Sequence, residues 1–311
     1  MKLLAAAAIS AALATGAAGA AASKPPSLAG CPVFPATSVW NTPVDRLPVA
    51  AGSARTIAAI GVDGHVHADF GSGLYDGSRI GVPFVVVHGA QTPKSHVSFD
   101  YADESDRGPY PIPANVPIEG APAHANTGDR HALIVDRDSC TLYELYALRR
   151  SGSGWSAGSG AIWNLRSNKL RPAGWTSADA AGLPILPGLA RWDGDASTGR
   201  IDHALRFTVA RSRRAYIYPA RHQAGSSTDP ALPPMGLRVR LKAAVNITRL
   251  PRQARIVAQA LKTYGMIVAD NGSSWFIGGA PSPHWSNDQL HALGGLTGAD
   301  FEVVDTSKLR P

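Results

Sequence analysis

The sequence predicts a mainly β protein in which antiparallel sheets form a β-sandwich or jelly roll with one or two packed helices. The first observation is the frequency of turn-forming residues, because 32 glycines and 24 prolines interrupt the chain at short intervals. The second is that the runs between them are short and rich in β-branched and aromatic residues, as strands are. The sequence has no repeat of fixed period, which argues against a propeller or a solenoid.

The N-terminal residues predict a secretory signal peptide over residues 1–21. The stretch MKLLAAAAISAALATGAAGAAAS begins with a single lysine, continues as an apolar run and ends in small residues, and we expect cleavage near Ala20 to Ala22. The run is short and rich in alanine, so a retained membrane anchor is the less favoured interpretation. We therefore expect a secreted protein, extracellular or periplasmic, with no membrane span and a single β-sandwich-type domain over residues 22–311.

Cys31 and Cys140 are the only cysteines, so one bridge is the only pairing available within the chain. In the oxidising compartment that the signal peptide implies, we expect them to form a disulfide. It would close a loop of about 110 residues, for which the chain-entropy model gives roughly 4 to 5 kcal/mol of stabilisation. Two buried free thiols are the alternative.

The charge pattern argues against nucleic acid as a partner. The formal net charge is +7, with 30 lysines and arginines against 23 acidic residues, but the basic residues are dispersed and form no run. Arginine predominates among them, and its planar guanidinium suits carboxylates and phosphates, which leaves an acidic polysaccharide open as a partner. A solvated surface is the simpler interpretation.

The strand-like runs are distributed along the whole chain after the signal peptide. They are IGVPFVVVHG, HVSFDY, HALIVD, TLYELYAL, AIWNL, HALRFTVA, AYIYPA, LRVRLKA, YGMIVAD, SSWFIGG and FEVVD. The proline-rich residues 108–129 lie between two of these runs and predict an extended, ordered loop. The stretch ADNGSSWFIGG predicts a hairpin turn.

The most distinct helix is predicted over about residues 252–264. The stretch PRQARIVAQALKTYG has Pro251 near the first helical position and Gly265 as a left-handed cap. Its apolar residues form one stripe, so the helix should pack on a sheet. Shorter helices are expected in SARTIAAIG, in TSADAAGL with Thr176 as N-cap, and in PSPHWSNDQL.

Residues 128–148, GDRHALIVDRDSCTLYELYAL, predict a hairpin with unusual polar residues. If Asp138 and Ser139 form a two-residue loop, Leu133 lies opposite Glu144. One sheet face then carries the following residues: His131, Leu133, Val135, Cys140, Leu142, Glu144 and Tyr146. Because unpaired buried polar groups cost roughly 1 to 3 kcal/mol each, this cluster indicates a role beyond packing.

A second hairpin is predicted from IDHALRFTVA, the turn RSRR and AYIYPARH. Counting back from the turn, Phe207 lies opposite Tyr218 and His203 lies opposite His222, while Arg206 faces the other side. The shared face is apolar and aromatic, and the two histidines close one end of it. The alternative for each of these histidines is a hydrogen-bonded structural residue.

Several stretches resemble a family of exported bacterial proteins. They are HADFGSG, GPYPIP, GDRHALIVDRD, GWTSADAAGLPILPG and ADNGSSW, and the resemblance covers most of the chain after the signal peptide. It implies export and carries no activity with it, so the functional expectations rest on the residues.

These residues predict a secreted enzyme that cleaves an extracellular polysaccharide. In the lyase alternative, His203 or His222 removes a proton next to a uronate carboxylate that an arginine neutralises, and Tyr146 acts as the acid. In the hydrolase alternative, Glu144 acts with Asp69 or Asp136, because paired carboxylates suit glycosidic bonds. The candidate catalytic residues are His131, His203, His222, Glu144, Tyr146 and Asp69, and the candidate substrate-binding residues are His67, Arg206, Tyr218 and Trp275.

Two other functions are weighed against this enzyme. A non-catalytic glycan-binding or envelope protein would use exposed tryptophans as stacking platforms. A metal-dependent site would use His67, His203 and His222, with His65 and His67 on one strand face, although we expect no cofactor. The sequence has no G-x-S-x-G, no P-loop and no H-E-x-x-H, which argues against serine acyl transfer, nucleotide chemistry and zincin proteolysis.

Overall fold

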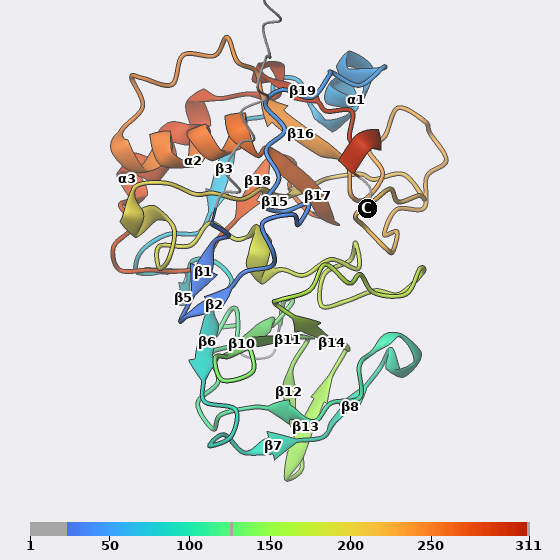
Figure 1. Ribbon diagram of the computed structural model, residues 1–311, viewed down its shortest axis with the longest axis vertical. Helices are drawn as coiled ribbons and strands as arrows, with labels where there is room; N and C mark the ends of the chain where they lie inside the picture. The colour runs from blue at the N-terminus through green and yellow to red at the C-terminus, as the bar shows by residue number, and fades with distance from the viewer. Residues whose placement is uncertain (1–23, 125–126, 310–311) are drawn as a thin grey trace, which may run out of the picture.

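The computed structural model describes residues 24–124 and 127–309, so the predicted signal peptide lies outside the described residues (Figure 1). The predicted mainly β class is confirmed, and strands outnumber helices throughout the described chain. The sheets are mixed, because parallel pairs such as β10 with β6 and β15 with β17 accompany the antiparallel ones.

The strands form three larger sheets. A six-stranded sheet has the order β19 (Phe301–Val303), β16 (Arg238–Leu241), β17 (Met266–Asn271), β15 (Leu205–Val209), β18 (Phe276–Gly278) and β3 (His67–Asp69). A four-stranded sheet has the order β14 (Ser159–Asn164), β11 (Thr141–Tyr146), β10 (Ala132–Asp136) and β6 (Phe84–Val87). A three-stranded sheet has the order β12 (Arg149–Ser151), β13 (Gly154–Ala157) and β8 (Val97–Phe99).

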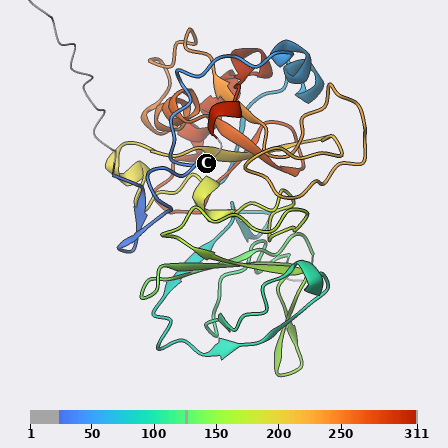
Figure 2. The same ribbon diagram turned by 45° about the vertical axis from the view of Figure 1, so that its right-hand side comes forward.

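Three strand pairs complete the β structure. They are β1 (Ser27–Leu28) with β2 (Cys31–Pro32), β4 (Leu74–Tyr75) with β5 (Ser78–Arg79), and β7 (Lys94–Ser95) with β9 (Tyr110–Pro111). In both views the six-stranded sheet and the helices occupy one half of the molecule, and the four- and three-stranded sheets occupy the other (Figures 1 and 2).

The α-helices lie where the sequence predicts them, with one exception. They are α1 (Ser53–Ile60), α2 (Arg252–Thr263) and α3 (Asn287–His291). Gly265 follows α2 with a φ of 67°, the left-handed geometry expected of the cap. The helix predicted from Thr176 is wrong: Ser177 Oγ accepts the Asp179 N–H at 2.9 Å, a local bond that closes a turn.

Two hydrophobic cores cover the two faces of the four-stranded sheet. Leu133, Val135 and Leu142 belong to the larger core, which also contains Phe207 and Val239 of the six-stranded sheet. The alternate residues of β10 and β11 belong to the smaller core, whose members include Ile134, Leu145, Tyr110 and Trp155. This explains why every residue of β10 is buried. Among the described residues, no helix is both long and apolar enough to cross a membrane.

The predicted register of the first hairpin is confirmed. Leu133 lies opposite Glu144 and Ala132 opposite Leu145, in the antiparallel pair of β10 and β11. The two faces of the pair therefore carry the residues that alternation assigns to them. His131 lies one residue before β10, and Tyr146 is the last residue of β11.

The second predicted hairpin is wrong. Strand β15 forms, but it pairs in parallel with β17 and antiparallel with β18. The residues after its turn form no strand; Tyr216 makes only an isolated parallel bridge to Met235. His203 and His222 are therefore not cross-strand partners. The hairpin turn predicted between β17 and β18 is wrong for the same reason, because β15 lies between these two strands.

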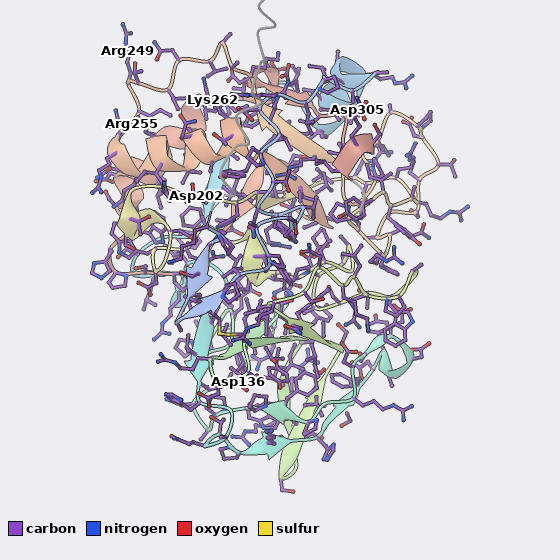
Figure 3. All side chains as sticks on the ribbon, in the orientation of Figure 1. Asp136, Asp202, Arg249, Arg255, Lys262 and Asp305 are labelled. Atoms are coloured by element: carbon purple, nitrogen blue, oxygen red, sulfur yellow. A yellow bond between two sulfur atoms is a disulfide. The ribbon has the colours of Figure 1, made fainter. Side chains whose placement is uncertain are left out.

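The predicted disulfide is confirmed. Cys31 of β2 is bonded to Cys140, directly before β11, and Figure 3 shows the bond in yellow between the N-terminal segment and the four-stranded sheet. Both cysteines are buried. The bond ties the N-terminal segment to the start of β11.

Replacing both cysteines by serine should lower the free energy of unfolding by about 4 to 5 kcal/mol, because the closed loop is long. Its ends are 109 residues apart in the sequence. Urea denaturation of the oxidised protein and of the Cys31→Ser, Cys140→Ser variant measures the difference. A reducing agent should leave the free energy of unfolding of the variant unchanged and should lower that of the wild type to the value of the variant. Equal urea midpoints for the two oxidised proteins would contradict the prediction.

Candidate functional site

A pocket of about 350 Å³ opens where the two halves of the molecule meet. This volume lies within the usual range of ligand sites. Its walls come from both sheets and from the segment between them. The lining residues are Tyr101, Glu104, Asp129, Tyr146, Ser159, Thr176, Ser177, Ala178, Asp179, Ala180, His222, Asp270 and Asn271. Strand ends supply several of them, since Tyr146 ends β11 and Asn271 ends β17.

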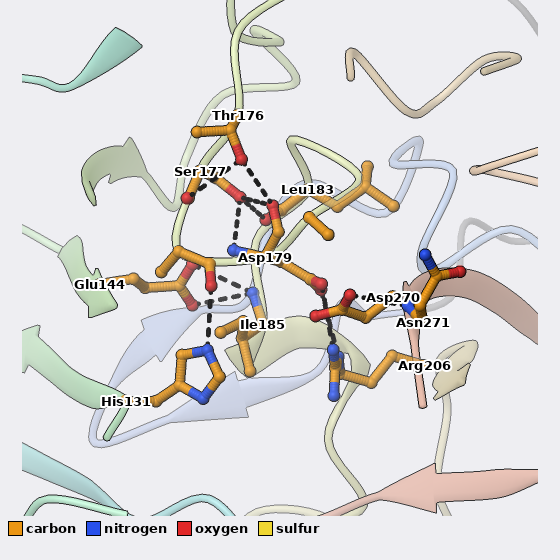
Figure 4. Close-up of polar contacts among 12 residues, drawn as sticks. His131, Glu144, Thr176, Ser177, Asp179, Leu183, Ile185, Arg206, Asp270 and Asn271 are labelled. Carbon is orange, nitrogen blue, oxygen red and sulfur yellow. Dashed lines mark hydrogen bonds and ion pairs between the residues drawn. The ribbon is translucent and has the colours of Figure 1, made fainter. Parts of the chain in front are cut away.

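The floor of the pocket contains a buried ion pair between Asp179 and Arg206. Arg206 of β15 reaches Asp179 with two bonds, from Nη2 to Oδ1 at 3.0 Å and from Nε to Oδ2 at 3.2 Å (Figure 4). Asp179 is completely buried. Burial raises the pKa of Asp179, and Arg206 opposes that rise. The arginine predicted to bind substrate is thus near the pocket, with its charge neutralised by Asp179.

Asp270 lies beside this ion pair and has a strongly perturbed carboxyl group (Figure 4). Its pKa is raised to about 7, chiefly by burial and then by the neighbouring Asp179, while Arg206 acts in the opposite direction. Below neutral pH this carboxyl group is therefore protonated and can donate a proton. A carboxyl group with a raised pKa in a pocket is the usual form of a general acid.

His131 lies behind the wall of the pocket and is held at both ring nitrogens. Nδ1 lies 2.5 Å from Glu119 Oε2, and Nε2 lies 2.9 Å from the carbonyl oxygen of Ala178. Because a carbonyl only accepts, Nε2 carries a hydrogen and Nδ1 shares a proton with Glu119. Burial lowers the pKa of His131, but the Glu119 carboxylate outweighs it and raises the pKa to about 9.

Tyr146 and His222 face the pocket from opposite halves. The ring of Tyr146 lies 5.7 Å from that of His131, centroid to centroid. Burial raises the pKa of Tyr146, followed by the effect of Asp129, so its hydroxyl keeps its proton at neutral pH. His222 Nδ1 lies 2.9 Å from the carbonyl oxygen of Ala180, which fixes Nδ1 as the donor and leaves Nε2 as an acceptor in the neutral ring.

Glu144 is fully buried behind the pocket, where it binds backbone groups. Its carboxyl oxygens accept the Ile185 N–H at 2.9 Å (Figure 4). They also accept the Leu186 N–H at 2.9 Å and the Trp163 indole N–H at 3.1 Å. Burial raises its pKa to about 7, while these donors lower it. Through these hydrogen bonds Glu144 anchors the segment that forms the pocket wall.

His203 occupies a separate buried cluster. Its Nε2 lies 3.1 Å from Asp195 Oδ2, which also forms an ion pair with Arg191 at 2.8 Å. His203 is only 1 % exposed, and the pocket does not include it. The histidine pair expected from the sequence is therefore divided between a buried cluster and the pocket.

The other predicted site residues lie outside the pocket. His67 stacks on Phe276 at the exposed edge of the six-stranded sheet. The Trp275 side chain is buried and donates its indole N–H to the carbonyl oxygen of Gly61 at 2.8 Å. Tyr218 lies beside a different hollow with Trp163.

Asp136 and Asp69, the two further carboxylates of the hydrolase prediction, do not line the pocket. Asp136 accepts the Gly89 and Asp138 N–H groups and the Ser139 hydroxyl, as a turn residue does. Asp69 ends β3 with an exposed side chain. Although the residue is exposed, partial desolvation of its carboxyl group raises the pKa of Asp69; His67 and Arg206 lower it and Glu119 raises it. Asp69 thus lies within electrostatic reach of the pocket.

Sequence reasoning missed the carboxylates that line the pocket, chiefly Asp129, Asp179 and Asp270. Two of them had a visible signal, because Asp129 lies shortly before the buried strand β10 and Asp270 lies near the end of β17. Asp179 had none, since it lies in a segment predicted as a helix. Among the described residues, only Glu119, Asp129 and His131 form a group that could hold a metal, and His67, His203 and His222 do not.

Comparisons of the chain with protein-family models, with curated proteins and with solved structures found no match.

Replacing Glu144 by alanine should lower the free energy of unfolding by about 3 kcal/mol or more, because buried N–H donors lose their acceptor. Glu144→Gln keeps one acceptor oxygen and should cost about 1 kcal/mol. Urea denaturation of both variants measures these differences. An alanine variant as stable as the glutamine variant would show that the hydrogen bonds of Glu144 do not anchor the pocket wall.

Proposed function

We propose that this protein is a secreted glycoside hydrolase that cleaves a polysaccharide in the pocket between the two sheets. The observation that carries the proposal is the Asp270 carboxyl group, which lines the pocket and has its pKa raised to about 7. Secretion is supported by the predicted signal peptide and by the Cys31–Cys140 disulfide, because such bonds persist in oxidising compartments.

The proposed reaction uses two carboxyl groups with different environments. Asp270 is the general acid, which protonates the glycosidic oxygen as the bond breaks. Asp129 is the second carboxylate, because it lines the same pocket and is exposed to solvent. Tyr146 and His222 are hydrogen-bonding groups for the sugar hydroxyls. This assignment keeps the predicted pairing of carboxylates and replaces Glu144, Asp69 and Asp136 as its members.

The charge of the pocket favours hydrolysis of a neutral glycan over elimination from a uronate. Four carboxyl groups line the pocket, those of Glu104, Asp129, Asp179 and Asp270. A lyase needs a free cation beside the uronate carboxylate, but Arg206 is already paired with Asp179. A uronate in this pocket would meet these carboxyl groups, and none of the lining residues is a lysine or an arginine.

Digestion of a panel of neutral polysaccharides should release new reducing ends without new ultraviolet absorbance. Elimination creates a double bond that absorbs in the ultraviolet, whereas hydrolysis does not. Absorbing products from a uronate-containing glycan would replace the hydrolase by the lyase. If no glycan of a broad panel gives new reducing ends or new ultraviolet absorbance, the proposal of an enzyme is wrong.

The Asp270→Asn variant should lose activity by about 10²- to 10⁴-fold, because the amide cannot donate an acidic proton. In the wild type, Asp270 is protonated below its pKa of about 7, so kcat/KM should fall as the pH rises through that value. Measuring kcat/KM against pH for the wild type and for Asp270→Asn tests both expectations. Asp103→Asn is the control, because it removes a carboxylate outside the pocket. Undiminished activity of Asp270→Asn, or a wild-type profile flat through pH 7, would exclude Asp270 as the acid.

A non-catalytic glycan-binding protein is the second candidate, and a second hollow favours it. This hollow has a volume of about 750 Å³ and is lined by Trp163, Trp175 and Arg171, among others. The indole of Trp175 is half-buried and offers a flat apolar surface of the kind that amphipathic ligands contact. Glycan binding by the wild type without release of products would favour this candidate.

A further inference from the structure

A cluster of three metal-ligating groups lies at the wall of the pocket, with Asp129 lining the pocket and the other two behind it. Glu119, Asp129 and His131 each place one ligand atom within 4.8 Å of the other two. Glu119 and Asp129 belong to the proline-rich residues 108–129, whereas His131 directly precedes β10. A polar atom from each of three side chains, converging from two segments, is the arrangement that a bound cation requires.

His131 has the orientation of a metal ligand. It is buried, and its Nε2–H donates to the carbonyl oxygen of Ala178 at 2.9 Å. Histidines that bind metals commonly donate their other ring N–H to a backbone carbonyl, which fixes the ring and its tautomer. Nδ1 is thereby directed at Glu119 Oε2, 2.5 Å away. A metal ion would replace the shared proton, and the two atoms would move to about 3.3 Å apart, because each lies about 2.0–2.2 Å from a tetrahedral ion.

The charges around the cluster are unbalanced toward the negative. Electrostatic contacts connect His131 with Asp129 and Glu119, and Arg206 with Glu119. The same arginine interacts with Asp69, Asp179 and Asp270. Five carboxyl groups thus share Arg206, His131 and, beside Asp69, His67. A divalent cation would offset part of this excess negative charge.

We propose that Glu119, Asp129 and His131 bind a divalent transition-metal cation of the Zn²⁺ or Mn²⁺ type. One imidazole nitrogen and two carboxylate oxygens suit zinc, which accepts both kinds of ligand, and manganese, which favours carboxylates. Calcium fits the cluster less well, because it takes oxygen ligands almost exclusively. Three protein ligands leave positions for water or for a substrate hydroxyl.

The ion would join two segments at the wall of the pocket. It would link the proline-rich segment to the start of β10 through Glu119 and His131. Asp129 lines the pocket, so the cation would also place positive charge beside the bound ligand. The site goes beyond the proposed hydrolysis but shares Asp129 with it, so Asp129 would serve that reaction as a metal ligand and not as a free carboxylate.

Isothermal titration of the purified protein with ZnCl₂ and with MnCl₂, after chelator treatment, tests the site in the absence of any glycan. We expect one high-affinity site per chain for at least one of the two ions. Asp129→Asn should weaken binding by about tenfold or more, as loss of groups at metal sites commonly does. Asp129 is exposed, so this variant should keep its fold. His131→Gln and Glu119→Gln, with circular dichroism as a check on folding, should weaken it as well.

The controls are His67→Gln and Asp103→Asn, which remove an exposed histidine and an exposed carboxylate outside the cluster. Both should bind the ion as the wild type does. Absence of a one-to-one site in the wild type, or equal affinity of Asp129→Asn, would overturn the proposal and leave a His131–Glu119 ion pair alone. Because no glycan is present, this outcome is independent of the hydrolase assays.

Discussion

The buried ion pair between Asp179 and Arg206 is the interaction on which the architecture of the pocket depends. It attaches the irregular residues 176–186 to the six-stranded sheet, and the Ala181 N–H bond to the Ala269 carbonyl at 3.0 Å adds to it. On the other side, Glu144 holds the same segment to the four-stranded sheet through Ile185 and Leu186. A largely irregular segment, which ends in a 3-10 turn at Leu186, is therefore fixed between two sheets, because its polar groups find buried partners in both.

The same ion pair sets the electrostatics of the pocket. Arg206 forms its ion pair with Asp179, so Asp270 lies beside a carboxylate and has no ion pair with an arginine. Removing one member of such a buried pair costs about 3 to 5 kcal/mol, because the other charge stays buried without compensation. Burial is the main cause of the raised pKa of Asp270, and the ion pair that holds the pocket together adds to it through Asp179 and opposes it through Arg206.

Prediction from sequence succeeded where the pattern was local. In the first hairpin the tight turn after Asp136 sets the register, and alternation then assigns Glu144 and Leu133 to one face. It failed in the second, where β15 has the same alternating pattern. Its partners β17 and β18 lie far along the chain, and competition among distant strands is decided by packing and loop closure, which no local pattern records.

The sequence by itself determined the mainly β class, the principal helix α2, the first hairpin and the single possible disulfide. Each follows from periodicity, turn chemistry or cysteine count, which act over short stretches or require no geometry. Only the tertiary structure decided which polar residues meet. Asp129, Asp179, His222 and Asp270 come from four separate segments, and their convergence arises because one buried ion pair and one buried carboxylate hold residues 176–186 between two sheets.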